Sequence, residues 1–460
     1  MYQINFNHPC HIHFIGIGGI SMSGLAEILL EEGFSVSGSD AKKSPLTEHL
    51  EQKGAVIYYG QKAENLADRP DLVVYTSAIH PDNPEYAAMK QLAIPSLTRA
   101  ELLGQMMRNY KLPVAISGTH GKTTTTSMVS EILLAADADP TLSIGGILKS
   151  IGGNVRIGHS DFFVTEACEY TNSFLSFFPK IGIILNVEED HLDFFKDIDD
   201  IRNSFHRFAS LLPSDGTLII GDDIPHKETI LEGLTCNVVT FGQTPHADYF
   251  PEDIVYDEAG CASFTLCRKV SAEKERFTLK VPGEHNVLNA LAAIALSDLF
   301  SIPYETLKKA LSSFSGTDRR FEYKGKVNGI VIIDDYAHHP TEITATLKAA
   351  ANYPHKTLWC VFQPHTYTRT KAFMQDFAKA LSLADQVILA DIYPARETDN
   401  LGISSETLKD QITALGKTCY YFPSFEQIQK FILENCTPGD LLITMGAGDV
   451  VNIGENLLKA

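Results

Sequence analysis

Apolar residues occur along this chain in two alternating patterns. Short continuous apolar runs predict buried strands, and longer stretches with apolar residues at every third or fourth position predict amphipathic helices. The run from Leu112 to Ile116 shows the first pattern, and the helical stripe that follows it is formed by Val129, Ile132, Leu133 and Ala136. Because such strands and helices alternate throughout the chain, the pattern predicts an α/β fold built on open parallel sheets.

The alternation restarts twice, and we interpret the chain as three α/β domains. Its 460 residues exceed what one hydrophobic core usually organises, and about 150 residues per domain is the general expectation. The pattern predicts a Rossmann-like N-terminal domain at 1–110, a central domain with a P-loop ATPase-type sheet at 111–316, and a Rossmann-like C-terminal domain at 317–460. The second boundary falls in the linker Gly316-Thr317-Asp318.

A glycine-rich loop joins the strand at Leu112 to the helix that follows it. Its residues are Gly118, Thr119, His120, Gly121, Lys122, Thr123 and Thr124. The glycines let backbone N–H groups face an anion at a helix N-terminus, Lys122 reaches the outer phosphates, and the Thr123 hydroxyl is placed to ligate magnesium. The expected ligand is ATP with Mg²⁺. The loop is shorter than the general P-loop pattern, so a glycine-rich turn with an incidental lysine is the alternative interpretation.

A second glycine-rich loop, residues 16–24, follows the predicted strand His11 to Ile15. The next strand ends at Ser39 and Asp40, which is where a dinucleotide-binding unit places the acid that binds a ribose hydroxyl. Ser21 stands where the third glycine of the G-x-G-x-x-G pattern is expected, which weakens the NAD interpretation. A nucleotide diphosphate can use the same loop, because backbone amides need only approach a pyrophosphate.

Polar residues follow several other predicted strands. Glu166 and His191 come after two successive strands of the central segment, where ligands of open parallel sheets collect. They suit magnesium if the ion shares its shell with phosphate oxygens. Asn286 and Asn289 are neighbours on a predicted helix and present amide groups suited to an adenine edge. In the third segment, similar clusters contain the histidine doublet at 338–339, of which we assign function to the first and a structural role to the second.

Charge and cysteine content narrow the classes of function. A formal charge of −19 argues against nucleic acid or an anionic membrane as the main partner. The eight cysteines form no C-x-x-C pair and no zinc-binding spacing, so we expect reduced thiols. The N-terminal residues lack a signal-peptide pattern, and no apolar run approaches membrane-spanning length. We therefore expect a cytoplasmic protein without membrane insertion.

Five motifs in order resemble the Mur ligases of peptidoglycan assembly. They are Gly-Ile-Gly-Gly-Ile-x-Met-Ser-Gly at 16–24, Gly-Thr-His-Gly-Lys-Thr-Thr at 118–124, Asp-His-Leu-Asp at 190–193, His-Asn-x-x-Asn-Ala at 285–290, and Asp-Asp-Tyr-Ala-His-His-Pro-Thr-Glu at 334–342. Within that family, the match is best to members that attach L-alanine to UDP-N-acetylmuramate. The resemblance implies an N-terminal domain for the UDP-sugar, a central ATPase domain, and a C-terminal domain that closes over ATP and helps to bind the amino acid.

The resemblance also implies roles for individual residues. ATP would be bound by residues 118–124 of the phosphate loop together with Asn286, Asn289, Arg320 and Asp335. The UDP-sugar would be bound by Gly16, Gly18, Gly19, Ser39, Asp40 and Ser77. The amino acid would be bound by Tyr336, His338 and Arg369, and magnesium by Thr123, Glu166 and His191. The catalytic set would be Lys122, Glu166, His191 and His338. Two departures from relatives are visible: no lysine occurs at 203–206, where some carry a carbamylated lysine, and Thr366 replaces an arginine that some alanine ligases have.

The reaction that the resemblance implies proceeds through an acyl phosphate. The lactyl carboxylate of UDP-N-acetylmuramate attacks the γ-phosphorus of ATP, and the α-amine of alanine then displaces phosphate from the acyl phosphate. Three alternatives remain open. They are a sister ligase with another amino acid or peptide, a nicotinamide oxidoreductase that uses the first glycine loop, and a non-catalytic ATP-driven switch. The sequence leaves the oligomeric state open.

Overall fold

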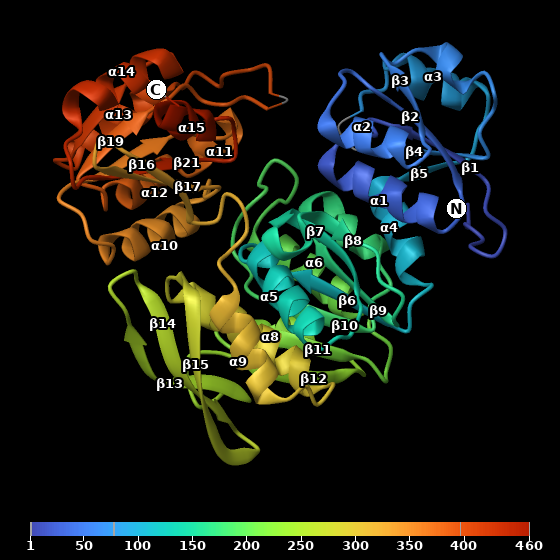
Figure 1. The fold of residues 1–460 in the computed structure, drawn as a ribbon, viewed down its shortest axis with the longest axis horizontal. Coiled ribbons are helices and arrows are strands. Elements are labelled where there is room, and N and C mark those ends of the chain that lie inside the picture. Colours follow the sequence, from blue (N-terminus) through green and yellow to red (C-terminus); the bar gives the residue numbers. More distant parts are fainter. Residues whose placement is uncertain (1, 77–78, 396, 460) are drawn as a thin grey trace.

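The computed structural model describes residues 2–76, 79–395 and 397–459. Its described residues form three sheets of five, ten and six strands, each with its own helices. Figure 1 shows these as three bodies, with the N-terminal part in blue, the central part in green and yellow, and the C-terminal part in orange and red. The predicted α/β class with three sheet-containing domains is therefore confirmed.

The N-terminal sheet is parallel, with the strand order β3-β2-β1-β4-β5. Its strands are β1 His11–Ile15, β2 Ser35–Asp40, β3 Val56–Tyr59, β4 Leu72–Tyr75 and β5 Ser96–Thr98. Its helices are α1 Ile20–Glu31, α2 Pro45–Gln52, α3 Pro84–Gln91 and α4 Arg99–Met107, with a 3₁₀ turn, η1, at Ala63–Leu66. Because β1 lies between β2 and β4, the strand order reverses at the carboxyl end of β1, which is where an open sheet binds ligands.

The central sheet combines a parallel part with an antiparallel extension. The order is β15-β14-β13-β12-β11-β10-β6-β9-β7-β8, and the pairs from β12 to β7 are parallel. The strands are β6 Leu112–Ser117, β7 Thr141–Leu148, β8 Gly153–Arg156, β9 Phe162–Ala167, β10 Ile181–Ile184, β11 Thr217–Gly221, β12 Asn237–Phe241, β13 Tyr249–Tyr256, β14 Cys261–Arg268 and β15 Ser271–Pro282. The helices are α5 Lys122–Ala135, α6 Ile198–Ala209, α7 Lys227–Leu231, α8 His285–Asp298 and α9 Tyr304–Ser313, with 3₁₀ turns η2 Lys149–Ile151 and η3 Tyr170–Ser176.

The C-terminal sheet has the order β16-β17-β21-β18-β19-β20, and only the edge pair β16–β17 is antiparallel among these described strands. The strands are β16 Glu322–Val327, β17 Ile330–Asp335, β18 Leu358–Phe362, β19 Gln386–Leu389, β20 Thr418–Tyr421 and β21 Leu441–Met445. The helices are α10 Pro340–Ala351, α11 Tyr367–Ala372, α12 Met374–Leu381, α13 Ser405–Ala414, α14 Phe425–Asn435 and α15 Val451–Lys459.

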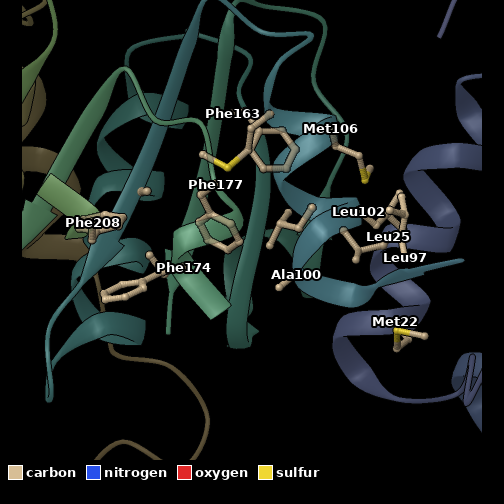
Figure 2. Packing of buried hydrophobic residues seen from close by; sticks show 14 of the residues in the cluster. Met22, Leu25, Leu97, Ala100, Leu102, Met106, Phe163, Phe174, Phe177 and Phe208 are labelled. Atoms are coloured by element: carbon tan, nitrogen blue, oxygen red, sulfur yellow. The ribbon is translucent and has the colours of Figure 1, made fainter. Parts of the chain in front are cut away.

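The first hydrophobic core runs from the N-terminal part into the central part. Figure 2 shows Leu25 of α1 beside Leu102 of α4, and Met22, Met106 and the phenylalanines of β9, η3 and α6 belong to the same cluster. Close packing extends to the backbone, because a Cβ added to Gly104 of α4 would lie 1.9 Å from the carbonyl oxygen of Ser176. Helix α4 is therefore docked directly on the central domain. The boundaries after residues 110 and 316 stay predictions, although α4 ends at residue 107 and β16 begins at residue 322.

Two sequence expectations concern features other than the sheets. Within the described ranges, no helix is both long and apolar enough to cross a membrane. All eight cysteines lie in those ranges, and each is a free thiol.

Candidate active site

Three residues of the predicted phosphate loop, His120, Gly121 and Thr124, line a cavity of about 340 Å³ between the central and C-terminal sheets. Its walls contain residues from both sides: His120, Gly121, Asn286, Asn289, Arg320 and Asp335. The two asparagines are buried and hydrogen-bonded to each other, since Asn289 Nδ2 donates to Asn286 Oδ1 at 3.0 Å. Burial raises the pKa of Asp335 to about 6, against the opposing charge of Arg320. The structure therefore brings the predicted nucleotide residues of two domains together.

The phosphate loop has the geometry that its glycines require. Gly118 and Gly121 have φ values of +143° and +85°, which L side chains rarely adopt. A Cβ on Gly121 would also lie 2.7 Å from Asn289 Oδ1. The loop is fastened to the strand beside it, because the backbone N–H of His120 donates to Asn186 Oδ1 at 2.8 Å and Asn186 Nδ2 donates back to the His120 carbonyl at 3.0 Å.

Lys122 lies at the start of α5 and is paired with a buried carboxylate. Its Nζ donates to the carbonyls of Gly118 and Thr119 at 2.5 and 3.0 Å and to Glu169 Oε2 at 2.9 Å. Burial alone would lower the pKa of Lys122, but the Glu169 carboxylate outweighs it and holds the pKa above its ordinary value. The lysine is therefore a fixed positive charge.

The predicted magnesium residues lie next to this pair. Thr123 Oγ1 donates to Glu166 Oε2 at 3.2 Å, and the backbone N–H of Gly145 donates to Glu166 Oε1 at 2.5 Å. Burial raises the pKa of Glu166. Glu169 Oε1 is buried without a hydrogen-bond partner in the structure, and it lies 3.7 Å from His191 Nε2. A carboxylate oxygen that accepts no hydrogen bond from a described residue, in a site that also contains the oxygen atoms of Thr123 and Glu166, suits a hard divalent cation, which prefers oxygen ligands.

His191 connects this set to the next cavity. It has a φ of +54°, a left-handed conformation that is uncommon outside glycine, and its backbone N–H donates to Asp190 Oδ1 at 2.7 Å. Burial lowers the pKa of His191 despite the nearby Asp190 and Glu169 carboxylates. A neutral imidazole keeps a lone pair that is available to a cation.

The predicted amino-acid residues line a second cavity of about 330 Å³. Its walls include His191 from the central domain and Tyr336, His338, Thr368, Arg369 and Glu397 from the C-terminal domain. Burial lowers the pKa of His338 to about 3, and its Nδ1 lies 3.1 Å from the Tyr336 carbonyl. The neutral ring therefore donates from Nδ1 and presents Nε2 as an acceptor. His339 instead caps α10, since its Nδ1 accepts from the Thr341 N–H at 3.3 Å.

Arg369 is engaged with the protein itself. Its Nε and Nη2 both donate to Asp190 Oδ1, at 3.1 and 2.8 Å, and its Nη1 lies 3.3 Å from His365 Nδ1. Asp190 is buried, and a buried carboxylate needs a counter-charge. Thr366, at the position where some relatives have arginine, caps the short helix α11 through its Oγ1 at 3.4 Å from the Arg369 N–H.

Several residues at this site were missed in the sequence. No role is predicted from the sequence for Glu169, which follows Glu166 by three positions and pairs with Lys122, or for Glu342, which faces the phosphate loop from α10. Arg319 likewise has no role predicted from the sequence, yet its Nε donates to Oδ2 of the fully buried Asp334 at 3.0 Å. The sequence signal that could have identified the two glutamates is their position three or four residues after an assigned residue, Glu166 or His338. Which carboxylate meets which cation depends on the fold.

The first glycine loop is organised by the residues assigned to it. The N–H groups of Gly16 and Ile17 both donate to the Ser39 carbonyl at 2.9 Å, and the Gly18 N–H donates to Asp40 Oδ2 at 2.9 Å. Gly19 is the residue before α1 and donates to the Gly16 carbonyl at 3.3 Å. Ser77, the remaining residue of this assignment, lies outside the described residues. The Asp40 carboxylate therefore shapes the loop in this structure.

A third group of polar atoms lies beside the nucleotide cavity. Among the described residues, His120, Glu188 and His339 offer ligand atoms that all lie within 4.8 Å of one another. Two of these residues belong to the central domain, and the third belongs to the C-terminal domain.

Comparison with known families places this architecture in a class of ligases. Three family models match in order: "Mur ligase family, catalytic domain" over residues 11–111, "Mur ligase middle domain" over 116–297, and "Mur ligase, glutamate ligase domain" over 319–448. With these matches and the close full-length relatives described next, the chain belongs to the Mur ligase family.

The similar curated proteins carry one activity in their names. The chain is 61% identical over 459 residues to a UDP-N-acetylmuramate–L-alanine ligase of Agathobacter rectalis, with full coverage of both chains. It is 52% identical over 457 residues to the ligase of the same name from Caldanaerobacter subterraneus, with 99% of each chain covered. Among solved structures, a UDP-N-acetylmuramate-alanine ligase from Thermotoga maritima matches with a TM-score of 0.82 at 30% identity, covering 98% of each chain.

Proposed function

We propose that this chain is an ATP-dependent ligase that joins L-alanine to the lactyl carboxylate of UDP-N-acetylmuramate, a step in making peptidoglycan precursors. The full-length likeness to relatives named for that activity supports the choice of substrates. The structural observation that carries the proposal is a pair of cavities that are both lined by residues of the central and C-terminal domains. The first is lined by His120, Gly121 and Thr124 of the phosphate loop, and the second contains polar groups suited to an amino acid. His191 lines the second cavity and lies 3.7 Å from Glu169, the partner of Lys122 in the phosphate loop.

ATP would lie in the first cavity with its phosphates on residues 118–124 and its adenine near Asn286 and Asn289. Arg320 and Asp335 would approach the nucleotide from the C-terminal domain. Thr123, Glu166 and His191 would hold Mg²⁺, which supplies charge neutralisation for the phosphates. The unpartnered Glu169 oxygen supports this placement, because it lies among these groups and accepts no hydrogen bond from a described residue.

The protein's own groups support an acyl-phosphate route. The lactyl carboxylate would attack the γ-phosphorus and displace ADP, with the fixed charge of Lys122 stabilising the developing charge on the transferred group. The amine of alanine would then attack the acyl carbonyl and expel phosphate. In the second cavity, Tyr336 and His338 would offer polar contacts to alanine, and Arg369 would bind its carboxylate through the fork that it now turns to Asp190.

The UDP-sugar would bind at the first glycine loop, through Gly16, Gly18, Gly19, Ser39, Asp40 and Ser77. The reversal of strand order at β1 supports this position. We also propose that the reaction takes place in the cytoplasm, in agreement with eight free thiols among the described residues.

Phosphate release measured with ATP, Mg²⁺, UDP-N-acetylmuramate and a panel of amino acids tests this function. We expect release that requires both the UDP-sugar and L-alanine. Release without any amino acid would favour an ATP-driven switch. Faster release with another amino acid or with a peptide would identify a sister ligase.

A further inference from the structure

The side chain of His120 points out of the phosphate loop toward the C-terminal domain. Its backbone is fixed within the central domain by two hydrogen bonds to Asn186. Its side chain instead has His120 Nδ1 at 3.1 Å from Glu342 Oε1 and Nε2 at 3.5 Å from Glu188 Oε2. Glu342 belongs to the first turn of α10, and Glu188 follows β10. The side chain therefore spans the junction of two domains, while the loop does not depend on it for its own conformation.

We propose that His120 is a positioning residue that fastens the phosphate loop to α10, and so holds the nucleotide cavity closed. His120, Glu188, Thr341 and Glu342 all line that cavity. This inference rests on the proposed function only in taking the cavity as the ATP site.

A second contact joins the same two elements. Thr341 Oγ1 of α10 donates to Glu188 Oε2 at 2.7 Å, so the Glu188 carboxylate faces both the phosphate loop and the helix. Glu342 is held on the other side, because its Oε2 accepts from the backbone N–H groups of His338 and His339 at 3.1 and 3.4 Å. Oε2 of Glu342 therefore accepts hydrogen bonds at the N-terminus of its own helix, whereas Oε1 contacts His120 of the central domain.

The alternative occupant of this cluster is a metal ion bound by His120, Glu188 and His339. The contacts of His120 favour a protonated imidazole ring over a bound metal ion. His120 Nδ1 lies within hydrogen-bond distance of Glu342 Oε1, and Nε2, which has no hydrogen-bond partner among the described residues, lies 3.5 Å from Glu188 Oε2. A positively charged ring is attracted to both carboxylates. Burial would lower the pKa of His120, but Glu342 and Glu188 raise it to about 9, so the ring is an imidazolium at neutral pH. His339 also uses Nδ1 to accept from Thr341, which leaves the proton on its Nε2 and no lone pair for a metal.

The test is a double-substitution cycle read out by nucleotide affinity. The variants are His120→Gln, Glu342→Gln and the double variant, titrated with ADP and Mg²⁺ in the absence of the other substrates. Glutamine at 342 still accepts the cap bonds of α10. We expect each single variant to bind about tenfold more weakly, the effect of losing about 1.4 kcal/mol. We expect the double variant to bind no more weakly than either single one, because all three lack the same contact.

The matched control is His49→Gln, which breaks an exposed histidine–glutamate pair of the same 3.1 Å length far from the cavity. It should leave ADP affinity unchanged. Additive losses in the double variant, or unchanged affinity in Glu342→Gln, would overturn the proposal. So would a gain in affinity on adding zinc chloride that His120→Gln abolishes, since it would show a metal bridge. Unchanged ADP affinity with lost phosphate release would overturn the positioning role while leaving the proposed ligase function standing.

Discussion

Replacing Lys122 by methionine should separate two roles of this residue, in stability and in catalysis. The Lys122 ammonium lies 2.9 Å from Glu169 Oε2, and the exposed fractions of the two side chains are 17% and 3%. Methionine has a similar length but no charge. The substitution would leave the Glu169 carboxylate buried without its counter-charge, in addition to removing a cation from the phosphate loop.

The magnitudes follow from these contacts. Removing one partner of a buried pair costs about 3–5 kcal/mol, and the partial exposure of Lys122 places the expected loss near 3 kcal/mol. For a domain of this size that loss lowers the midpoint of thermal unfolding by roughly 6–12 °C. Phosphate release should fall on the order of a hundredfold or more, because a preorganised charge is lost at the transferred group.

The second substitution Glu169→Gln tells the two roles apart. The double variant Lys122→Met/Glu169→Gln no longer buries an unpaired charge, so its unfolding midpoint should return most of the way to that of the wild type. Its activity should stay low. Thermal unfolding and phosphate release are measured on the same preparations. The control is Lys111→Met, which removes one partner of the exposed pair with Asp161 and should change neither. A single variant as stable as the wild type, or a double variant no more stable than the single one, would refute the reasoning.

Three further predictions concern other contacts. Arg369→Lys should raise the KM for L-alanine strongly and leave ATP affinity nearly unchanged, because lysine keeps the positive charge but cannot donate two parallel hydrogen bonds to a carboxylate. In steady-state kinetics with each substrate varied in turn, an unchanged KM for alanine would show that another residue binds its carboxylate. Gly104→Ala should lower the unfolding midpoint clearly, because its Cβ would lie 1.9 Å from a backbone oxygen, whereas Gly153→Ala meets nothing closer than 3.9 Å and should be nearly silent. The pKa of His120 is raised from 6.5 to about 9 on folding, so its contribution to stability is complete below pH 6.5 and is lost as the pH rises through about 9. The gap in unfolding midpoint between wild type and His120→Gln should therefore shrink across that range, and a gap that grows would contradict the assignment.

Local patterns were enough to predict the fold class and the phosphate loop. The strand from Leu112 and the apolar stripe of the next helix are β6 and α5, and the strand predicted at His11 to Ile15 is β1. These elements are set by neighbours in the chain, since the side-chain period of a strand or helix is written into consecutive residues. The glycines of the phosphate loop are equally local, because their positive φ values are a property of the backbone at those positions.

The tertiary structure decided which charges meet. Glu169 pairs with Lys122 across 47 positions, Glu342 faces His120 across 222, and Asp190 holds Arg369 across 179. Each of these side chains is a common surface residue by type, and nothing in its neighbourhood in the chain identifies its partner. The partners are chosen because folding buries the carboxylates, and a buried carboxylate is stable only beside a donor or a cation. The sequence by itself therefore determined the elements and the glycine-rich loop predicted to bind phosphate, whereas the docking of three sheets decided which charged side chains surround that loop.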